Sequence, residues 1–439
     1  MKPAADDTAA DEVVDICRDL LRIDTTNTGD ASTTAGERPA AEYVAEKLTE
    51  VGIDVQLHES APGRANLVAR IAGADASRGA LLVHGHLDVV PADARDWTLP
   101  PFAGEERDGY LWGRGAIDMK DFDAMMLAVV RHWRRSGVTP PRDIVLAFTA
   151  DEEAGMQYGS QYLVDRHRDL FDGCTEAIGE VGGFSYTVND DLRLYLVETA
   201  EKGIDWLKLH ARGRAGHGSF VHDDNAVTAL AEAVARVGRH RFPMVVTPTV
   251  RAFLEQVSDA LGVDLDPDDP ELAIAKLGPI ANLIGATVRN TANPTRLSAG
   301  YKDNVIPGRA SATIDCRTLP GQAEIFLQQL REVIGPDIEI EHLQQQQALE
   351  TGFDGALVDA MGAALRAEDP GARAVPYMLS GGTDAKAFTR LGIRCFGFAP
   401  LRLPADLNFA ALFHGVDERV PVDGLQFGAR VLDRFLRAS

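Results

Sequence analysis

The chain has 439 residues, of which 45% are hydrophobic and 25% charged, a composition typical of water-soluble globular proteins. Its 66 acidic residues outnumber 44 basic ones, and the formal net charge of −22 argues against nucleic acid or an anionic membrane as the partner. Two domains are expected, because a single hydrophobic core rarely grows beyond about 250–300 residues.

The cysteines and the N-terminus favour a cytoplasmic location. Residues 1–7 have no apolar stretch behind a basic start, so we expect no secretory signal. No apolar run approaches the ~20 residues that a membrane helix needs. The four cysteines are widely spaced and include no Cys-x-x-Cys pair, which indicates neither a disulfide framework nor a thiolate metal site.

The first two hundred residues alternate between two hydrophobic periodicities. Helical spacing covers residues 11–23, 38–51, 121–133 and 159–167, and short apolar runs at 66–71, 80–84 and 144–149 are typical of buried strands. This alternation predicts an α/β fold with a mostly parallel central sheet, which places ligands at the carboxyl ends of its strands.

From about residue 200 the pattern changes to half-exposed strands. We expect strands at 206–212, 295–300, 310–317 and 337–342, and helices at 225–237 and 322–334. The order βα-ββ-αβ predicts a small α+β domain over residues 200–347, with helices on one face of an antiparallel sheet. Residues 243–285 do not fit and are interpreted as an insertion of uncertain form. The first domain, residues 1–199, then resumes at 348–439.

Candidate metal ligands follow the strands of the first domain. They are His86 with Asp88, then Asp118, the run Asp151-Glu152-Glu153, Glu180, and His414 near the C-terminus. Imidazole and carboxylate together suit borderline divalent ions such as Zn²⁺. Three successive carboxylates after a buried strand repel one another unless a cation neutralises them.

Each of these residues also has a simpler interpretation when it is taken alone. His86 and Asp88 could be a hydrogen-bonded loop pair, Asp118 a helix N-cap, the acidic run a solvated loop and His414 a surface histidine. The His-x-Asp spacing points both side chains to one side, so the aspartate could accept the second ring N–H of the histidine. His84 has the same parity and is left as a neighbour.

Together these motifs resemble the dinuclear-zinc family of acetylornithine deacetylase, succinyl-diaminopimelate desuccinylase, glutamate carboxypeptidase and aminoacylase. The resemblance spans essentially the whole chain. It implies a zinc-peptidase-like catalytic domain with an inserted ferredoxin-like lid or dimerisation domain. It assigns one ion to His86, Asp118 and Glu180 and the other to Asp118, Glu153 and His414. Glu152 would be the general base and Asp88 the partner of His86.

The resemblance also implies the chemistry. A water that bridges two ions is ionised near neutral pH, and the resulting hydroxide attacks the carbonyl while Glu152 moves the proton to the leaving amine. A cis peptide between Asp118 and Met119 is expected. Relatives often have a second glycine where this chain has Met156. Glu180, where dipeptidase and tripeptidase relatives tend to have Asp, favours a deacylase or a carboxypeptidase.

The smaller domain is expected to complete the site. Glu201-Lys-Gly203 and the segment around His217 resemble the family's lid or dimerisation domain, in which this histidine stabilises the oxyanion from the partner subunit. Asn304 and Arg317 resemble residues that grip a substrate carboxylate, and Gly382 with Thr383 resembles a loop lining the pocket. By themselves, His217 could be an exposed turn residue and Arg317 part of a strand-edge salt bridge.

We therefore expect a homodimeric, two-metal hydrolase of amide bonds next to a free carboxylate, in N-acyl amino acids or peptides, with Zn, Co or Mn as the metal. Three alternatives remain: a binding module that kept the fold without the chemistry, a dipeptidase of the same family, and an esterase-like hydrolase with one metal. No Gly-x-Ser-x-Gly nucleophile motif supports the last of these.

Overall fold

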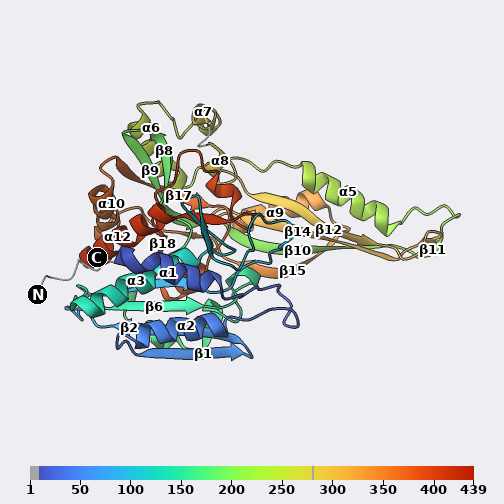
Figure 1. The fold of residues 1–439 in the computed structure, drawn as a ribbon. Coiled ribbons are helices and arrows are strands. Elements are labelled where there is room, and N and C mark those ends of the chain that lie inside the picture. Colours follow the sequence, from blue (N-terminus) through green and yellow to red (C-terminus); the bar gives the residue numbers. More distant parts are fainter. Residues whose placement is uncertain (1–8, 279–280) are drawn as a thin grey trace, which may run out of the picture. The chain divides into compact units, whose positions relative to one another are not determined.

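The computed structural model describes residues 9–278 and 281–439, which form two compact units (Figure 1). Unit 1 contains residues 9–198, Phe353–Val375 and Thr383–Ser439, and unit 2 contains Thr199–Gly352 and Pro376–Gly382. The last segment was expected with the first domain, but in unit 2 the Lys202 amide donates a hydrogen bond to the Leu379 carbonyl (3.1 Å). The expectation of no secretory signal concerns residues that lie outside the described part of the chain.

The main sheet of unit 1 is parallel at its centre, which confirms the expected α/β fold. Strand β3 (Ala80–His86) lies parallel between β6 (Ile144–Thr149) and β7 (Cys174–Gly179), and β7 is parallel to β18 (Arg394–Gly397). Antiparallel strands flank this centre: β1 (Val55–Ala61), β2 (Arg64–Ile71) and β9 (Leu192–Glu201). Every residue of β3 and β6 is buried, as a strand covered on both faces requires.

Helices of unit 1 pack on this sheet and on one another. Helix α3 (Lys120–Ser136) packs against β3, and α1 (Ala9–Leu21) and α12 (Val422–Ala438) pack against α3. Helix α2 (Arg38–Thr49) contacts β2, and α10 (Ala356–Glu368) contacts α12. No helix among the described residues has both the length and the hydropathy needed to cross a membrane.

The following helices and strands belong to unit 1, except that β16 lies in unit 2 and β17 runs from unit 1 into unit 2. They are β4 (Glu105–Arg107), β5 (Tyr110–Trp112), β8 (Phe184–Asn189), β16 (Leu349–Glu350), β17 (Ala372–Leu379), β19 (Arg419–Pro421), α4 (Ser160–Arg166) and α11 (Ala385–Phe388). Strands β19, β5 and β4 form a separate small sheet.

Unit 2 has the expected ferredoxin-like core. Its antiparallel sheet has the order β12 (Thr291–Ala299), β14 (Arg309–Thr318), β10 (Gly203–Arg212), β15 (Glu339–Gln346). Helices α5 (Ala226–Arg239) and α9 (Ala323–Ile334) share a hydrophobic core with alternate residues of β10, namely Leu207, Leu209 and Ala211. A two-stranded extension is formed by β11 (Gly216–His217) and β13 (Val305–Ile306).

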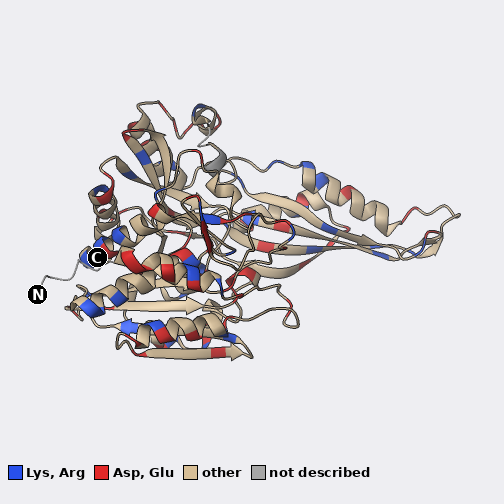
Figure 2. Ribbon diagram, in the orientation of Figure 1, with Lys and Arg blue, Asp and Glu red and all other residues tan. Residues whose placement is uncertain are grey.

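The described residues of the insertion, whose form the sequence left uncertain, are mainly helical; residues 279–280 lie outside the described part of the chain. They form α6 (Pro248–Leu261), α7 (Pro270–Lys276) and α8 (Ala281–Ile284). Thr247 and Asp269 cap the first two helices by accepting backbone N–H bonds, and each cap is followed by proline at the first helical position. These Thr-Pro and Asp-Pro pairs were signals that the sequence interpretation overlooked. Figure 2 shows acidic and basic residues on helices and strands of both units.

Candidate metal centre

The predicted ligands converge because neighbouring parallel strands end side by side. His86 is the last residue of β3, and Glu180 directly follows β7 on one side of it. The acidic run follows β6 on the other side, and η1 (Glu152–Ala154) begins there. One edge of the buried sheet therefore carries ligands from three strands.

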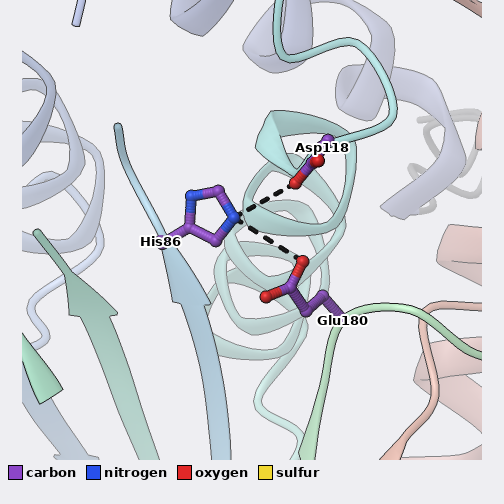
Figure 3. A group of neighbouring side chains, drawn as sticks. All are labelled: His86, Asp118 and Glu180. Atoms are coloured by element: carbon purple, nitrogen blue, oxygen red, sulfur yellow. Dashed lines mark hydrogen bonds and ion pairs between the residues drawn. The ribbon is translucent and has the colours of Figure 1, made fainter. Parts of the chain in front are cut away.

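His86, Asp118 and Glu180 form the first candidate ion site, and their side chains point toward one another (Figure 3). The His86 Nε2 atom lies 3.2 Å from Asp118 Oδ1 and 3.6 Å from Glu180 Oε2. All three side chains are buried. A histidine nitrogen with two converging carboxylate oxygens matches the ligand preference of Zn²⁺ and similar ions.

Asp118, Glu153 and His414 form a second group that shares Asp118 with the first. The His414 Nε2 atom lies 3.0 Å from Glu153 Oε2 and 3.3 Å from Asp118 Oδ2. The two Asp118 oxygens thus face different histidines, with Oδ1 toward His86 and Oδ2 toward His414. This arrangement suits a carboxylate that bridges two ions.

The simpler interpretation of Asp118 as a helix N-cap does not hold. The N-cap of α3 is Met119, and its side chain makes no capping hydrogen bond. The expected cis peptide between Asp118 and Met119 is present. Met156, where relatives often have glycine, has a φ of 68°, a left-handed conformation that glycine adopts more easily.

Asp88 orients its neighbours differently from the expectation. The His86 Nδ1 atom lies 2.9 Å from the backbone carbonyl oxygen of Asp88, whereas the nearest carboxylate oxygen is 3.7 Å away. The carboxylate instead accepts the backbone N–H groups of Glu152 (3.1 Å) and Glu153 (3.2 Å). Asp88 therefore fixes both the ring of His86 and the turn that carries the expected base and a ligand.

Asp151 does not join the candidate metal centre, although it begins the acidic run. Its Oδ1 atom accepts hydrogen bonds from Arg64 (2.9 Å) and from Asn27 (3.1 Å). The Asn27 amide also donates to Asp88 Oδ2 (2.8 Å), and Arg64 pairs with Glu37 (2.7 Å). Arg64 and Asn27 thus satisfy the carboxylate of Asp151. Of the acidic run, only Glu152 and Glu153 are left to take part in the chemistry of the candidate metal centre. Sequence reasoning missed Asn27 and Arg64, whose only signal was their polarity next to apolar segments.

The electrostatics of the centre are those of a cation site. Burial raises the pKa of Glu180 to about 8 and, together with the charge of Glu180, raises the pKa of Glu152 well above its usual range. Hydrogen bonds to Asp118 and Glu153 raise the pKa of His414 to about 10. Divalent cations would reverse these directions, because they stabilise carboxylates and displace the histidine protons.

Another observation supports the fit to metal. Glu153 Oε1 is buried and has no hydrogen-bond partner within the described part of the chain. An unpartnered carboxylate oxygen costs free energy unless a ligand binds it. The donor set of two imidazoles and three carboxylates can therefore hold two divalent ions.

The candidate site residues expected in the smaller domain lie in two separate places of unit 2. His217 and Asn304 lie together on the β11–β13 extension, where the backbone N–H of Gly218 donates to the Asn304 carbonyl (2.9 Å). His217 is exposed, and its Nδ1 atom is 2.8 Å from Ser219 Oγ. Arg317 lies near the other end of β14, where its Nε atom donates to Asp315 (2.7 Å).

Asn304 and Arg317 were each expected to help grip a substrate carboxylate, and within one chain Asn304 precedes the Arg309 end of β14 whereas Arg317 lies near the other end. Arg317 lies eight residues after Arg309, the residue of β14 next to the extension. At about 3.3 Å per residue this is about 26 Å. Within one chain the two residues are thus far apart along the sheet, and their role in binding a substrate carboxylate stays a prediction.

Residues of the loop before α11 make hydrogen bonds that fix the start of this helix. Thr383 is buried, and its hydroxyl accepts the Ala385 N–H (3.2 Å). Gly382 is half-buried beside it. The following Asp384 accepts hydrogen bonds from Ser160 (2.5 Å) and Thr149, which fixes the start of α11 against the end of β6.

The sequence has many characterised relatives. It is 26% identical over 442 residues to N-fatty-acyl-amino acid synthase/hydrolase PM20D1 of Xenopus tropicalis, a match that covers 94% of this chain and 83% of that protein. It is also 26% identical over 397 residues to aminoacylase-1 of Sus scrofa, covering 87% of this chain and 85% of that one.

The fold has a solved counterpart. The M20 family metallo-carboxypeptidase Sso-CP2 from Sulfolobus solfataricus superposes with a TM-score of 0.73 at 19% identity, covering 97% of this chain and 99% of that one. The sequence profile of peptidase family M20/M25/M40 matches residues 82–438, which include the candidate ligands His86, Asp118, Glu153, Glu180 and His414. The chain therefore belongs to peptidase family M20/M25/M40, and it is an amide hydrolase.

Proposed function

We propose that this enzyme uses two divalent metal ions, most fittingly Zn²⁺, to cleave an amide bond adjacent to a free carboxylate in an N-acyl amino acid or a peptide. The observation that carries this proposal is the pair of ligand groups that share Asp118. His86 and Glu180 would complete one ion site, and Glu153 and His414 the other. Co²⁺ or Mn²⁺ would suit the same oxygen and nitrogen donors.

Two ions held in this way would polarise the amide carbonyl and lower the pKa of a water molecule between them. Glu152 would accept the proton of the attacking water and deliver it to the nitrogen of the leaving amine. Its main chain is fixed by Asp88, which accepts the Glu152 N–H at 3.1 Å. Glu152 is half-buried beside the candidate ligand Glu153.

Substrate recognition would rest on a cation for the free carboxylate. Arg317 offers a planar guanidinium for two parallel hydrogen bonds, and Asp315 already orients it (2.7 Å). Gly382 and Thr383 would line the pocket on the acyl or peptide side. Glu180 as a ligand, together with the similarity to aminoacylase-1 and PM20D1, favours N-acyl amino acids over dipeptides.

A homodimer would explain why His217 and Asn304 are far from Arg317 along the sheet. In a dimer, the exposed extension of one subunit could serve the site of its partner, where His217 would donate to the oxyanion. Large apolar side chains beside the extension support an interface: Phe220 is 69% exposed, Val221 91% and Tyr301 83%. Such side chains are rarely left in water when they lie close together.

The alternative of a binding module without chemistry requires a missing ligand or base, and all of these positions are filled. A dipeptidase of the same family would use the same centre with a different pocket. We also propose a cytoplasmic location, which is supported by four cysteines that are all free thiols: Cys17, Cys174, Cys316 and Cys395.

Metal reconstitution combined with substrate profiling tests the proposal. Apoenzyme would be loaded with Zn²⁺, Co²⁺ or Mn²⁺, its metal content measured, and hydrolysis followed on a panel of N-acyl amino acids, dipeptides, C-terminally blocked analogues and simple esters. We expect two ions per chain and loss of activity when the carboxylate is amidated. One ion with ester hydrolysis, or two ions with no amide hydrolysis, would contradict the proposal.

A further inference from the structure

Two loops that supply ligands to the second candidate ion site are joined by one buried ion pair. Arg114 is 3% exposed and Glu418 is fully buried, and Arg114 Nη1 donates to Glu418 Oε2 at 2.6 Å. Arg114 lies four residues before Asp118, and Glu418 lies four residues after His414. Neither residue belongs to the candidate ligand groups.

The Glu418 carboxylate holds the loop that leads into Asp118. Its Oε1 atom accepts the backbone N–H of Ile117 (2.8 Å), and its Oε2 atom accepts that of Gly115 (3.1 Å). The Glu418 carbonyl accepts the N–H of Gly113 (3.0 Å). These bonds connect the segment immediately before Asp118 to the C-terminal loop.

The Arg114 guanidinium holds the loop that carries His414. Its Nη2 atom donates to the carbonyl oxygen of Gly415 (2.9 Å), the residue next to His414. His414 itself has a φ of 56°, a conformation that a residue with a side chain keeps only when its surroundings enforce it. The Arg114 guanidinium therefore holds the loop of His414 directly, through Gly415. It also holds the Glu418 carboxylate, which in turn binds the loop before Asp118.

We propose that Arg114 and Glu418 are positioning residues that set the affinity of the second ion site, formed by Asp118, Glu153 and His414. The first site depends on them less. Its other two ligands, His86 and Glu180, stand at the ends of β3 and β7 in the central sheet, so they keep their places without the ion pair. The inference rests on the proposed two-metal function.

Arg114→Lys in the full-length protein tests the inference. Lysine keeps the positive charge, but a single ammonium cannot reproduce the fork that reaches both Glu418 and Gly415. Residues that orient metal ligands typically change metal affinity by about 10- to 100-fold when they are altered. We expect the second Co²⁺ dissociation constant to rise by about that factor and the first by less than about threefold.

Apoprotein is titrated with CoCl₂, and binding is measured both by calorimetry and by the visible absorption of bound Co²⁺. The matched control is Arg142→Lys in the same unit. Arg142 also pairs with a carboxylate, Glu176 (2.7 Å), and donates to a carbonyl, that of Gly79 (3.2 Å), but neither partner lies next to a candidate ligand. The control should leave both Co²⁺ constants within about threefold.

Glu418→Gln provides a second variant that keeps the side-chain size, in case Arg114→Lys fails to fold. Selective weakening of the second ion in either variant, with the control unaffected, supports the inference. Equal weakening of both ions, an equal effect in the control, or unchanged second-ion affinity in both variants would overturn it. A wild-type protein that binds fewer than two ions would instead overturn the proposed function, and this inference with it.

Discussion

Buried carboxylates of unit 1 differ in what neutralises them. Glu37, Glu418 and Asp369 each have an arginine partner, namely Arg64 (2.7 Å), Arg114 (2.6 Å) and Arg193 (2.6 Å). At the candidate metal centre the carboxylates of Asp118, Glu153 and Glu180 face two histidines and one another. Arginine neutralises the first three carboxylates within the chain, whereas the three at the candidate metal centre converge with the histidines as a cation site requires.

This difference also separates neighbours in the sequence. Asp151 and Glu153 are two residues apart in the same acidic run, yet Arg64 pairs with the first and a candidate ion site takes the second. Burying a carboxylate without a partner costs free energy, and Arg64 offsets that cost for Asp151, whereas Glu153 Oε1 has no hydrogen-bond partner among the described residues. For these two neighbours the partner, and not the residue type, indicates the role.

The largest effect should come from Glu152→Gln. The amide cannot accept a proton from water, so we expect turnover to fall by at least ~10²–10⁴, while both metal ions remain bound. Steady-state kinetics on the best N-acyl amino acid, with metal analysis of the same preparation, would measure this. Near-normal turnover would show that Glu152 is not the base.

His217→Ala should have the next largest effect. Loss of one oxyanion donor typically lowers turnover by ~10²–10³, and metal content should not change. Mixing this variant with Glu152→Gln should restore part of the activity, because a mixed dimer contains one site with both wild-type groups. If light scattering finds a monomer and that monomer is fully active, an active site shared between two subunits is excluded.

Metal removal should lower the thermal stability of the protein. Ions bound to the folded state at a concentration 100 times their Kd add ~2.7 kcal/mol per site, so chelation should lower the thermal midpoint. His414→Ala should remove about half of that stabilisation by abolishing one site. Calorimetric melting with and without chelator would check this, and an unchanged midpoint would argue against metal binding.

Asp369→Asn should have the smallest effect and should act on stability alone. The hydrogen bonds from Arg193 lower the pKa of Asp369 despite its burial, with help from Tyr195 (2.8 Å). We expect a loss of ~1.5–3 kcal/mol near neutral pH, the range for hydrogen bonds to charged groups. Metal stoichiometry and turnover should stay normal.

The pH dependence of Asp369 follows from the direction of that shift. A lowered folded-state pKa stabilises the protein fully above the unfolded pKa of about 4, and this stabilisation is lost as the pH falls through the folded pKa. The asparagine variant should therefore lose less stability than wild type when denaturant melts are compared from pH 6 down to pH 3. A parallel loss in both proteins would refute the assignment.

Much of the fold was readable from periodicity. The helix expected at 38–51 is Arg38–Thr49, and the strand expected at 310–317 is Arg309–Thr318. The helices of the insertion at 243–285 were missed although α6 has 14 residues and buries Val250, Phe253, Leu254 and Val257 at helical spacing. Its caps Thr247 and Asp269, each followed by proline, were further signals of helices in this segment.

The candidate ligands were also identified from their order in the sequence, and so was the expected role of Glu152 as base. The sequence alone determined which residue types are available and that several of them follow buried strands. The tertiary structure decided which of them meet: it brought His414 to Asp118, gave Asp151 to Arg64, and placed Arg317 far from Asn304. Periodicity reports only which face a residue shares with its near neighbours, whereas partners hundreds of residues away are chosen by the packing of the whole unit.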